Sequence, residues 1–421
     1  MPTLKPFSRR YRDNNVGNVE DQSYNISASD EESIAQTKPR WYETKRGRRW
    51  ADAVGIEGFR SRGSKEDNPD RRAIRRRRCK FIWIVFGVAA FFGAVAAVTY
   101  VSLVAALIRR LNPPQVNNGL KHIVDTWKEP DSNGAFKYEW RDDFSRDIVP
   151  KSCHSHNDYW RSVPLYQALA AGCISFEADV WLNDDKELLV SHSWKSTKKE
   201  RTLRSLYLDP LANIFTNRNV SVASTERRET GMFDADPSMS TVLLIDFKND
   251  GQKIWPVLRE QLQPLHDKGW LTYYNGTTLI NGALTIVGTG NTPFDLVKQN
   301  NTNRFIFYDA PLNDISNPTY NSSNSYYASI SMSDAIGTIW LNQLNTGQVD
   351  TIKRQIKAAD EKGLKSRYWS TPSWPISFRN RVWFTLTDND VGMLNVDDLV
   401  SATRWNWNWC VIAGLTLCGH S

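Results

Sequence analysis

Most of this 421-residue chain lacks the excess of positive charge that its net charge of +7 suggests. Residues 1–80 hold 20 Lys and Arg against 12 Asp and Glu, whereas residues 81–421 hold 33 against 34. A globular domain that binds nucleic acid carries its own excess of Lys and Arg. The near-neutral balance after residue 80 therefore excludes nucleic acid as the partner of the main domain.

Cysteine and histidine are also scarce, with five and six residues respectively. Four cysteines form an even set after residue 100, and they allow three disulfide pairings in an oxidising compartment or, equally, four buried thiols. These cysteines are Cys153, Cys173, Cys410 and Cys418. Three of the six histidines, His154, His156 and His192, fall within 39 residues. This concentration points to a site.

Charge of either sign is absent from residues 81–108, FIWIVFGVAAFFGAVAAVTYVSLVAALI. A helix of this length exceeds the roughly 30 Å hydrocarbon core of a bilayer. A soluble helix of the same length would need a polar face, and this segment has none. It begins too far from the N-terminus for an ordinary cleaved signal peptide. We therefore predict a transmembrane signal anchor over 81–108.

The charges that flank this segment predict its orientation. Seven basic residues stand just before it, and only Arg109 and Arg110 follow it; the seven are Arg71, Arg72, Arg75, Arg76, Arg77, Arg78 and Lys80. The more basic side stays in the cytosol. We expect a single-pass type II protein with a disordered, basic cytosolic tail over 1–80 and a lumenal or extracellular remainder.

Asn-x-Ser/Thr triplets agree modestly with this topology. Four of them, at Asn219, Asn275, Asn300 and Asn321, lie in the predicted lumenal part, where they can be glycosylated. Asn25 begins another triplet on the cytosolic side, where it would not be used.

The lumenal part reads as a linker over 109–145, with a short helix near 119–128, and one domain over 146–421. Nine short apolar runs predict strands: the start of the domain at VPKSCHSH, then 173–182, 187–192, 241–248, 283–289, 304–310, 327–332, 364–369 and 391–396. Helical patterns over 163–172, 252–268 and 347–362 lie between them, which is typical of a parallel sheet. The size fits a (β/α)8 TIM-type barrel, with one of the nine runs as a hairpin arm.

The run CISFEADVWL (173–182) places two carboxylates on one face, because residues i and i+2 of a strand point the same way. Glu177 and Asp179 would lie about 6.6 Å apart along the strand and repel each other. Two such groups in a barrel need a cation between them or solvent around them. An isolated Glu-x-Asp more commonly marks a strand face turned to water.

Other strand ends favour a site over that simpler interpretation. His192 ends the run 187–192, Asp246 and Lys248 end the run 241–248, and His154–Asp158 end the first strand. The carboxyl ends of barrel strands form the active site. Carboxylates and the Asn157 amide oxygen suit Mg²⁺ or Ca²⁺ better than zinc. Two histidines suit acid–base catalysis, and a lysine beside the ion suits an anionic substrate.

These residues resemble those of the phospholipase C-like phosphodiesterase superfamily. More narrowly, HSHNDYWRSVPLYQAL (154–169) and RYWSTPSWP (367–375) are similar to the fungal family called altered inheritance of mitochondria protein 6, over about residues 150–400. The resemblance implies that His156 and His192 are the acid–base pair and that Lys248 neutralises phosphate. It further implies a metal held by Asn157, Glu177, Asp179 and Asp246. His154 is the rival of His156, and the resemblance favours His156.

The third acid departs from part of the superfamily. It is glutamate in several relatives, whereas Asp246 is similar to the sphingomyelinase D-like group, which leaves the headgroup open. We expect a metal-dependent phosphoric diester hydrolase or lyase that acts on a phospholipid or lipid-derived diester. The alternatives are a membrane-anchored, lipid-binding pseudoenzyme and a cytosolic adaptor whose tail is the functional part. Arg367 could lie at the barrel mouth or form a structural ion pair.

Overall fold

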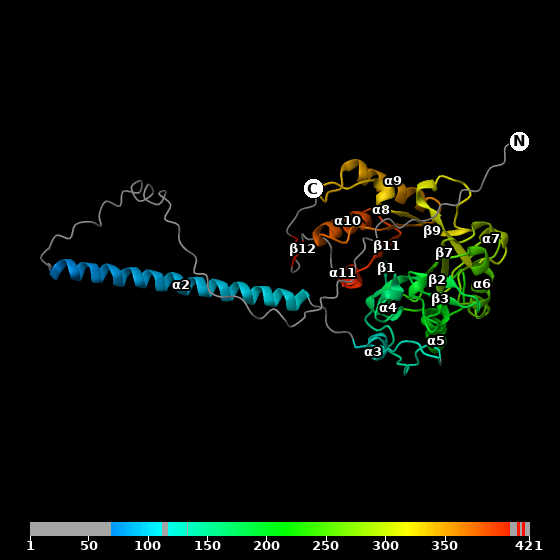
Figure 1. Cartoon of the computed structure of the whole chain (residues 1–421), viewed down its shortest axis with the longest axis horizontal. Helices are drawn as coiled ribbons and strands as arrows, with labels where there is room; N and C mark the ends of the chain where they lie inside the picture. The colour runs from blue at the N-terminus through cyan, green and yellow to red at the C-terminus, as the bar shows by residue number, and fades with distance from the viewer. Residues whose placement is uncertain (1–68, 112–116, 133, 405–410, 413–414, 417–421) are drawn as a thin grey trace, which may run out of the picture. The chain divides into compact units, whose positions relative to one another are not determined.

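The computed structural model describes residues 69–111, 117–132, 134–404, 411–412 and 415–416. It divides into a first unit over residues 1–95 and a second over 96–421. Figure 1 shows one long helix and a domain of strands and helices. The predictions for residues 1–68, Cys410 and Cys418 lie outside the described residues.

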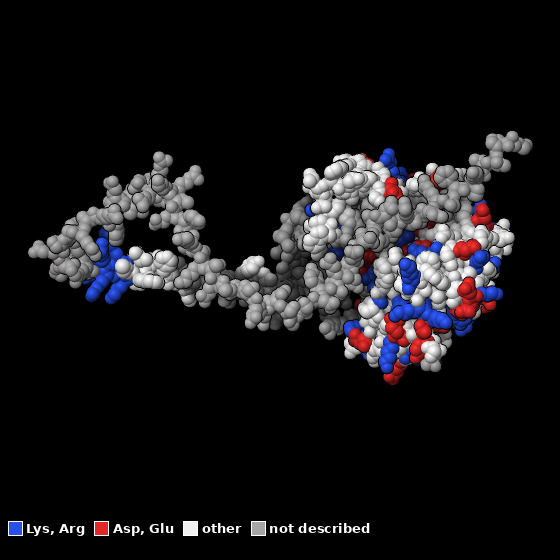
Figure 2. All heavy atoms as spheres, viewed as in Figure 1, with Lys and Arg blue, Asp and Glu red and all other residues white. Residues whose placement is uncertain are grey.

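A single helix, α2 (Pro69–Leu111), contains the predicted membrane segment. Its stretch Ala73–Ala106 is long and apolar enough to cross a membrane, with a mean hydropathy of 2.5. The side chains of this stretch are largely exposed, so the described protein does not bury it as it would bury a core helix. Figure 2 shows the basic cluster at one end of α2, and mixed charges over the visible face of the barrel.

Eight parallel strands close into a barrel in the second unit, which confirms the predicted fold class. In sheet order they are β1 (Lys151–Ser155), β11 (Met393–Val396), β10 (Lys365–Trp369), β9 (Ser325–Ser331), β8 (Ile306–Pro311), β7 (Leu284–Gly290), β4 (Thr241–Phe247) and β2 (Cys173–Leu182). Pairing of β1 with β2 closes the ring. The ninth predicted strand, β3 (Leu188–Val190), is the hairpin arm: it pairs antiparallel with β2.

Helices cover the barrel between most strands. They are α4 (Tyr166–Ala171), α5 (Asp209–Arg218), α6 (Gly251–Asp267), α7 (Phe294–Gln299), α8 (Met332–Ile336), α9 (Thr346–Asp360), α10 (Ile376–Asp388) and α11 (Leu399–Arg404). The predicted helices over 163–172, 252–268 and 347–362 correspond to α4, α6 and α9. The chain between β8 and β9 is described throughout and holds only the short 3₁₀ turn η4 (Leu312–Asp314).

Part of the segment predicted as a linker belongs to the core of the barrel unit. Helix α3 (Gly119–Thr126) begins at Asn118, whose side chain accepts a hydrogen bond from Lys121 N. Leu120, Ile123 and Phe144 are fully buried in the main hydrophobic cluster. Burial of these three side chains anchors the chain to the barrel well before residue 146.

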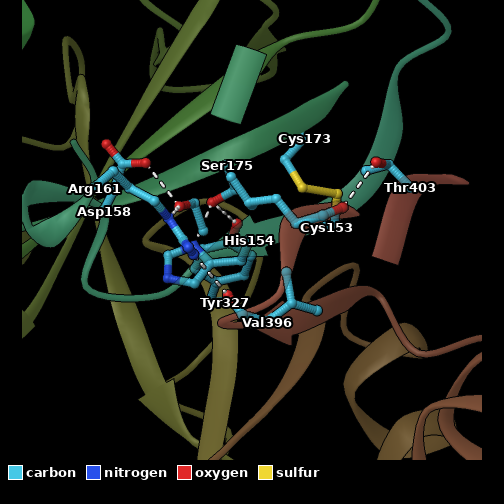
Figure 3. The surroundings of a disulfide bond; sticks show 11 residues. Cys153, His154, Asp158, Arg161, Cys173, Ser175, Tyr327, Val396 and Thr403 are labelled. Carbon is cyan, nitrogen blue, oxygen red and sulfur yellow. Dashed lines mark hydrogen bonds between the residues drawn. A yellow bond between two sulfur atoms is a disulfide. The ribbon is translucent and has the colours of Figure 1, made fainter. Parts of the chain in front are cut away.

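A disulfide joins Cys153 in β1 to Cys173 at the start of β2 (Figure 3). It realises one of the pairings that the even set of cysteines allows. The two strands that it links carry His154 and, further along β2, Glu177 and Asp179. The bond therefore holds together the two strands from which most of the predicted site is built.

Candidate active site

The register of the barrel strands brings the three predicted acids together. Asp179 in β2 lies directly beside Asp246 in β4, and Glu177 lies two residues earlier on the same face as Asp179. One carboxylate oxygen from each of the three lies within 4.8 Å of the others. Glu177 and Asp179 are only 6 % and 1 % exposed, so water screens their mutual repulsion poorly.

Lys248 balances part of this negative charge. Its Nζ lies 2.9 Å from Asp179 Oδ2 and 2.7 Å from Asp246 Oδ2. Burial opposes the charge on Lys248, but the two carboxylates outweigh burial and raise the pKa of the lysine. Burial raises the pKa of Asp246 to about 6; Lys248 counteracts this rise and the charge of Asp179 adds to it.

The end of β1 reaches the same cluster through a left-handed turn. Asn157 has φ +47°, and its backbone N–H donates a 3.0 Å hydrogen bond to Glu177 Oε2. Its side-chain oxygen lies 2.7 Å from the hydroxyl of Tyr159, which also lies 2.7 Å from Asp179 Oδ2. The structure thus places Asn157 beside the acids, as the sequence predicted.

His192 reaches the site by a route that the sequence did not predict. It does not follow a parallel barrel strand, as expected, because β3 runs back antiparallel along β2. Val190 pairs with Val180, and Ser191 N donates to Asp179 O at 3.1 Å. The returning arm brings His192 Nδ1 to 3.5 Å from Asp179 Oδ2. The run ELLVSH carries no signal of strand direction, so the error concerned direction and not the site.

The two rival histidines at β1 differ in access. His154 is fully buried and its Nδ1 lies 2.7 Å from Ser175 Oγ, which Tyr327 also contacts (Figure 3). Burial lowers the pKa of His154 to about 4, which keeps it neutral near pH 7. The His156 side chain is 27 % exposed, with Nε2 3.9 Å from Glu177 Oε2. Access therefore favours His156 over His154 as the group that meets a substrate.

Two further residues of the site were missed by the sequence analysis. Asp397 follows β11, and its Oδ1 lies 2.8 Å from His156 Nδ1. The rule that strand ends form the site would have included it. Tyr159 Oη contacts Asn157, Asp179 and, at 3.2 Å, His192 Nδ1. Its position inside the HSHNDYW motif was the available signal.

Arg367 forms the structural ion pair that the sequence left as one of two alternatives. It is 3 % exposed inside the barrel, with Nη2 3.3 Å from Asp309 Oδ2 and Nη1 2.8 Å from Asn395 Oδ1. The positive charge of Arg367 also lowers the pKa of Glu177. Burial opposes ionisation of Glu177, but His156, His154 and Arg367 outweigh burial and hold the pKa of Glu177 well below its usual range.

The acidic cluster has the donor chemistry of a Mg²⁺ or Ca²⁺ site. Glu177, Asp179 and Asp246 supply hard oxygen ligands, and Asn157 offers an amide oxygen beside them. Asp179 Oδ1 is buried and has no hydrogen-bond partner among the described residues. A buried carboxylate oxygen normally has a partner. These residues could therefore hold a divalent cation.

The chain is similar to known proteins of one family. Residues 142–309 match the family described as AIM6-like phosphodiesterase domain. The Altered inheritance of mitochondria protein 6 homolog of Arthroderma benhamiae is 44% identical over 277 residues, 63% of this chain and 87% of that protein. Altered inheritance of mitochondria protein 6 of Eremothecium gossypii is 34% identical, over 62% of this chain and 71% of that protein.

Two solved structures resemble the chain more distantly. A glycerophosphodiester phosphodiesterase from Thermotoga maritima has 11% sequence identity and a TM-score of 0.33, covering 60% of this chain and 97% of that one. The phosphatidylinositol-specific phospholipase C from Listeria monocytogenes has 11% identity and a TM-score of 0.30, covering 60% and 82%.

Substitution of Gly290, which is not one of the acids, tests whether the acidic cluster binds a metal ion. It ends β7 with φ +64°, and a Cβ at this position would lie 2.0 Å from Asp246 Oδ1. We expect Gly290→Ala to displace the Asp246 carboxylate and to weaken binding of Mg²⁺ or Ca²⁺ by about tenfold or more. The measurement is the rise in unfolding temperature that each ion produces relative to chelator.

Gly337 is the matched control for this substitution. It also has a positive φ, +70°, but a Cβ there would meet nothing within 4 Å. With ψ −162° this backbone conformation is nearly restricted to glycine, so Gly337→Ala should cost about 1–3 kcal/mol of backbone strain and keep the ion-dependent shift. An unchanged shift in Gly290→Ala would contradict a metal site at Asp246.

Proposed function

The chain belongs to the family of altered inheritance of mitochondria protein 6, and we propose that it is a membrane-anchored phosphoric diester hydrolase or lyase acting on a phospholipid or lipid-derived diester. The observation that carries the proposal is the meeting of three carboxylates, a lysine and two accessible histidines at the mouth of one barrel. Acids and lysine can hold a cation and a phosphate, and the histidines can move protons.

The acids and the lysine would bind the phosphate. A divalent cation held by Glu177, Asp179 and Asp246, with Asn157 beside them, would stabilise the negative charge that grows on the phosphate oxygens during the reaction. Lys248 already bridges Asp179 and Asp246 through its ammonium group. Its protons can turn to a phosphate oxygen, so it would orient the anionic group.

His156 is suited to the role of general acid. Burial lowers its pKa, but the charges of Glu177 and Asp397 outweigh burial and raise the pKa above its ordinary value. Its Nδ1–H donates to Asp397, which leaves Nε2 on the side of Glu177. A protonated Nε2 would donate its proton to the oxygen that leaves phosphorus.

His192 is suited to the role of general base. Tyr159 Oη and Asp179 Oδ2, both able to accept a hydrogen bond, face its Nδ1. They favour the tautomer with a proton on Nδ1, which leaves Nε2 free to take one. Nε2 would remove the proton of the attacking hydroxyl, which belongs to water in a hydrolase or to the substrate in a lyase.

The lipid substrate and the lumenal topology rest on other observations. Helix α2 is long and apolar enough to anchor the chain in a membrane. The Cys153–Cys173 disulfide is typical of an oxidising compartment. Both support a type II protein with its barrel in the lumen or outside the cell.

The alternative is a membrane-anchored lipid-binding module without turnover. One observation favours it: Lys248 Nζ already contacts two of the three acids and can balance their charge without an ion. The two functions differ in whether any diester is cleaved.

Turnover by the full-length protein in detergent tests the proposal. On a panel of glycerophospho-, inositol- and sphingolipid diesters we expect cleavage that needs Mg²⁺ or Ca²⁺ and that chelator abolishes. His192→Ala should lose about 100-fold or more, because a general base is removed. His122→Ala, in α3 and outside the site, should keep full activity. Lipid binding without metal-dependent cleavage of any diester would establish the binding module instead.

The pH profile of kcat/KM reports on the His156–Asp397 pair. A general acid with a raised pKa keeps its proton to higher pH, so the alkaline limb of the profile should lie above the ordinary histidine value of about 6.5. Asp397→Asn removes one of the charges that raise this pKa. The limb should therefore move to lower pH. Asp184→Asn, on the exposed β2–β3 turn, serves as the control, and an unmoved limb in Asp397→Asn would exclude His156 as the acid.

Glycosylation tests the topology. We expect glycans at one or more of Asn219, Asn275, Asn300 and Asn321, because a lumenal barrel meets the glycosylation machinery. Peptide N-glycosidase should increase the mobility of the native chain, and each used Asn→Gln change should remove one glycan. Asn25→Gln is the control on the cytosolic side. A glycan on Asn25 with none on the barrel would contradict the predicted orientation and indicate the opposite one.

A further inference from the structure

Four exposed tryptophans lie around the mouth of the barrel. Trp160 follows β1, Trp194 follows β3, Trp340 lies between β9 and α9, and Trp374 follows β10; they are 63%, 49%, 77% and 74% exposed. Loops that follow parallel strands all lie on one face of a barrel. Every exposed tryptophan of the described barrel residues is in this set, and exposed apolar side chains that gather on one face mark an interaction site.

Contacts place two of these tryptophans beside the site itself. The Trp160 ring lies 4.8 Å from the His192 ring, centroid to centroid. The Trp194 ring lies 6.1 Å from that of Trp181, near the end of β2. Trp194 thus lies at the mouth although it follows the antiparallel arm.

The exposed apolar side chains of these loops lie around one half of the barrel mouth. Strands β9, β10, β11, β1 and β2 are consecutive around the barrel, and the loops after four of them carry the tryptophans together with exposed Leu341. The loops after β4, β7 and β8 are described throughout and carry no large exposed hydrophobic side chain. We call the apolar half, Trp160, Trp194, Trp340, Leu341 and Trp374, the apolar rim.

The glycosylation triplets all lie on the opposite face. Asn219, Asn275, Asn300 and Asn321 stand in segments that lead into strands, and the sequence after residue 80 contains no other such triplet. Backbone hydrogen bonds join these segments to each other near the strand starts, for example Ala223 N to Gly269 O and Tyr274 N to Arg304 O. Any glycans on these triplets would therefore lie away from the mouth.

We propose that the apolar rim rests on the surface of a phospholipid bilayer, so that the active site opens toward the headgroups. Tryptophan is the side chain that prefers the membrane–water interface. Lys195, Lys198 and Lys199 are exposed beside Trp194, and they suit anionic headgroups. Residues 109–118 join the apolar part of α2 to α3, and a chain of this length spans at most about 35 Å, so a membrane crossed by α2 would be within reach of the barrel unit.

Photocrosslinking of the full-length protein tests this surface. A photoreactive benzoylphenylalanine replaces Trp194, Trp340 or Trp374 singly, and Val222 on the opposite face as the control (63% exposed). The protein is placed in nanodiscs of phosphatidylcholine and tagged phosphatidylserine. We expect at least about fivefold more lipid adduct from the rim positions than from position 222.

The charge on the rim gives a second measurement. The triple change Lys195→Glu, Lys198→Glu and Lys199→Glu should lower adduct formation in nanodiscs that contain phosphatidylserine and leave it unchanged in phosphatidylcholine alone. Equal adducts on both faces, or adducts from rim positions to a second copy of the chain in place of lipid, would overturn the proposal. Adducts are read without turnover, so this result is independent of whether the protein cleaves a diester.

Discussion

Mutual repulsion of three closely spaced carboxylates, two of them buried, is the constraint on which the rest of the barrel mouth depends. At a separation of up to 4.8 Å and an effective dielectric constant of about 20, each ionised pair repels by at least about 3.5 kcal/mol. Glu177, Asp179 and Asp246 can share one small volume only if cations compensate them. Lys248 supplies one positive charge by direct contact, and Arg367 contributes from deeper in the barrel. Burial raises the pKa of Asp246, the charge of Asp179 adds to this rise, and Lys248 offsets only part of it.

The backbone holds these carboxylates close together despite their mutual repulsion. Adjacent register of β2 and β4 sets Asp179 against Asp246, and the disulfide between Cys153 and Cys173 fixes β1 against β2. The absence of a side chain at Gly290 leaves room for Asp246. Each of these constraints is local. The free energy that stabilises the fold comes from the buried apolar core of the barrel and not from its charged mouth.

The sequence allowed the fold and most of the cluster to be predicted because both depend on simple periods. Alternation along CISFEADVWL places Glu177 and Asp179 on one face, and the strand-end rule adds Asp246, Lys248 and His156. The direction of a strand, parallel or antiparallel, does not follow from such periods. The apolar run 187–192 has the same composition whether it runs parallel or antiparallel, so only the structure shows that His192 returns along β2.

The strand-end rule would have included Asp397 as a residue of the site, but its contact with His156 was out of reach. Asp397 and His156 are separated by 241 residues and meet because β1 and β11 are neighbours in a closed ring, a pairing that no local pattern reports. The segment 109–145 looked like a linker because its apolar residues have no sustained period. Burial of Leu120 and Phe144 is a consequence of tertiary packing alone.

The hydroxyl of Tyr159 shows how closely the site's protons are constrained. It faces Asn157 Oδ1, Asp179 Oδ2 and His192 Nδ1, yet it has one hydrogen to donate. A bond to the ionised Asp179 is the strongest of the three choices. That choice requires His192 to donate from Nδ1 to the tyrosine oxygen. One proton of Tyr159 thus sets the tautomer of His192 and links that histidine to Asp179.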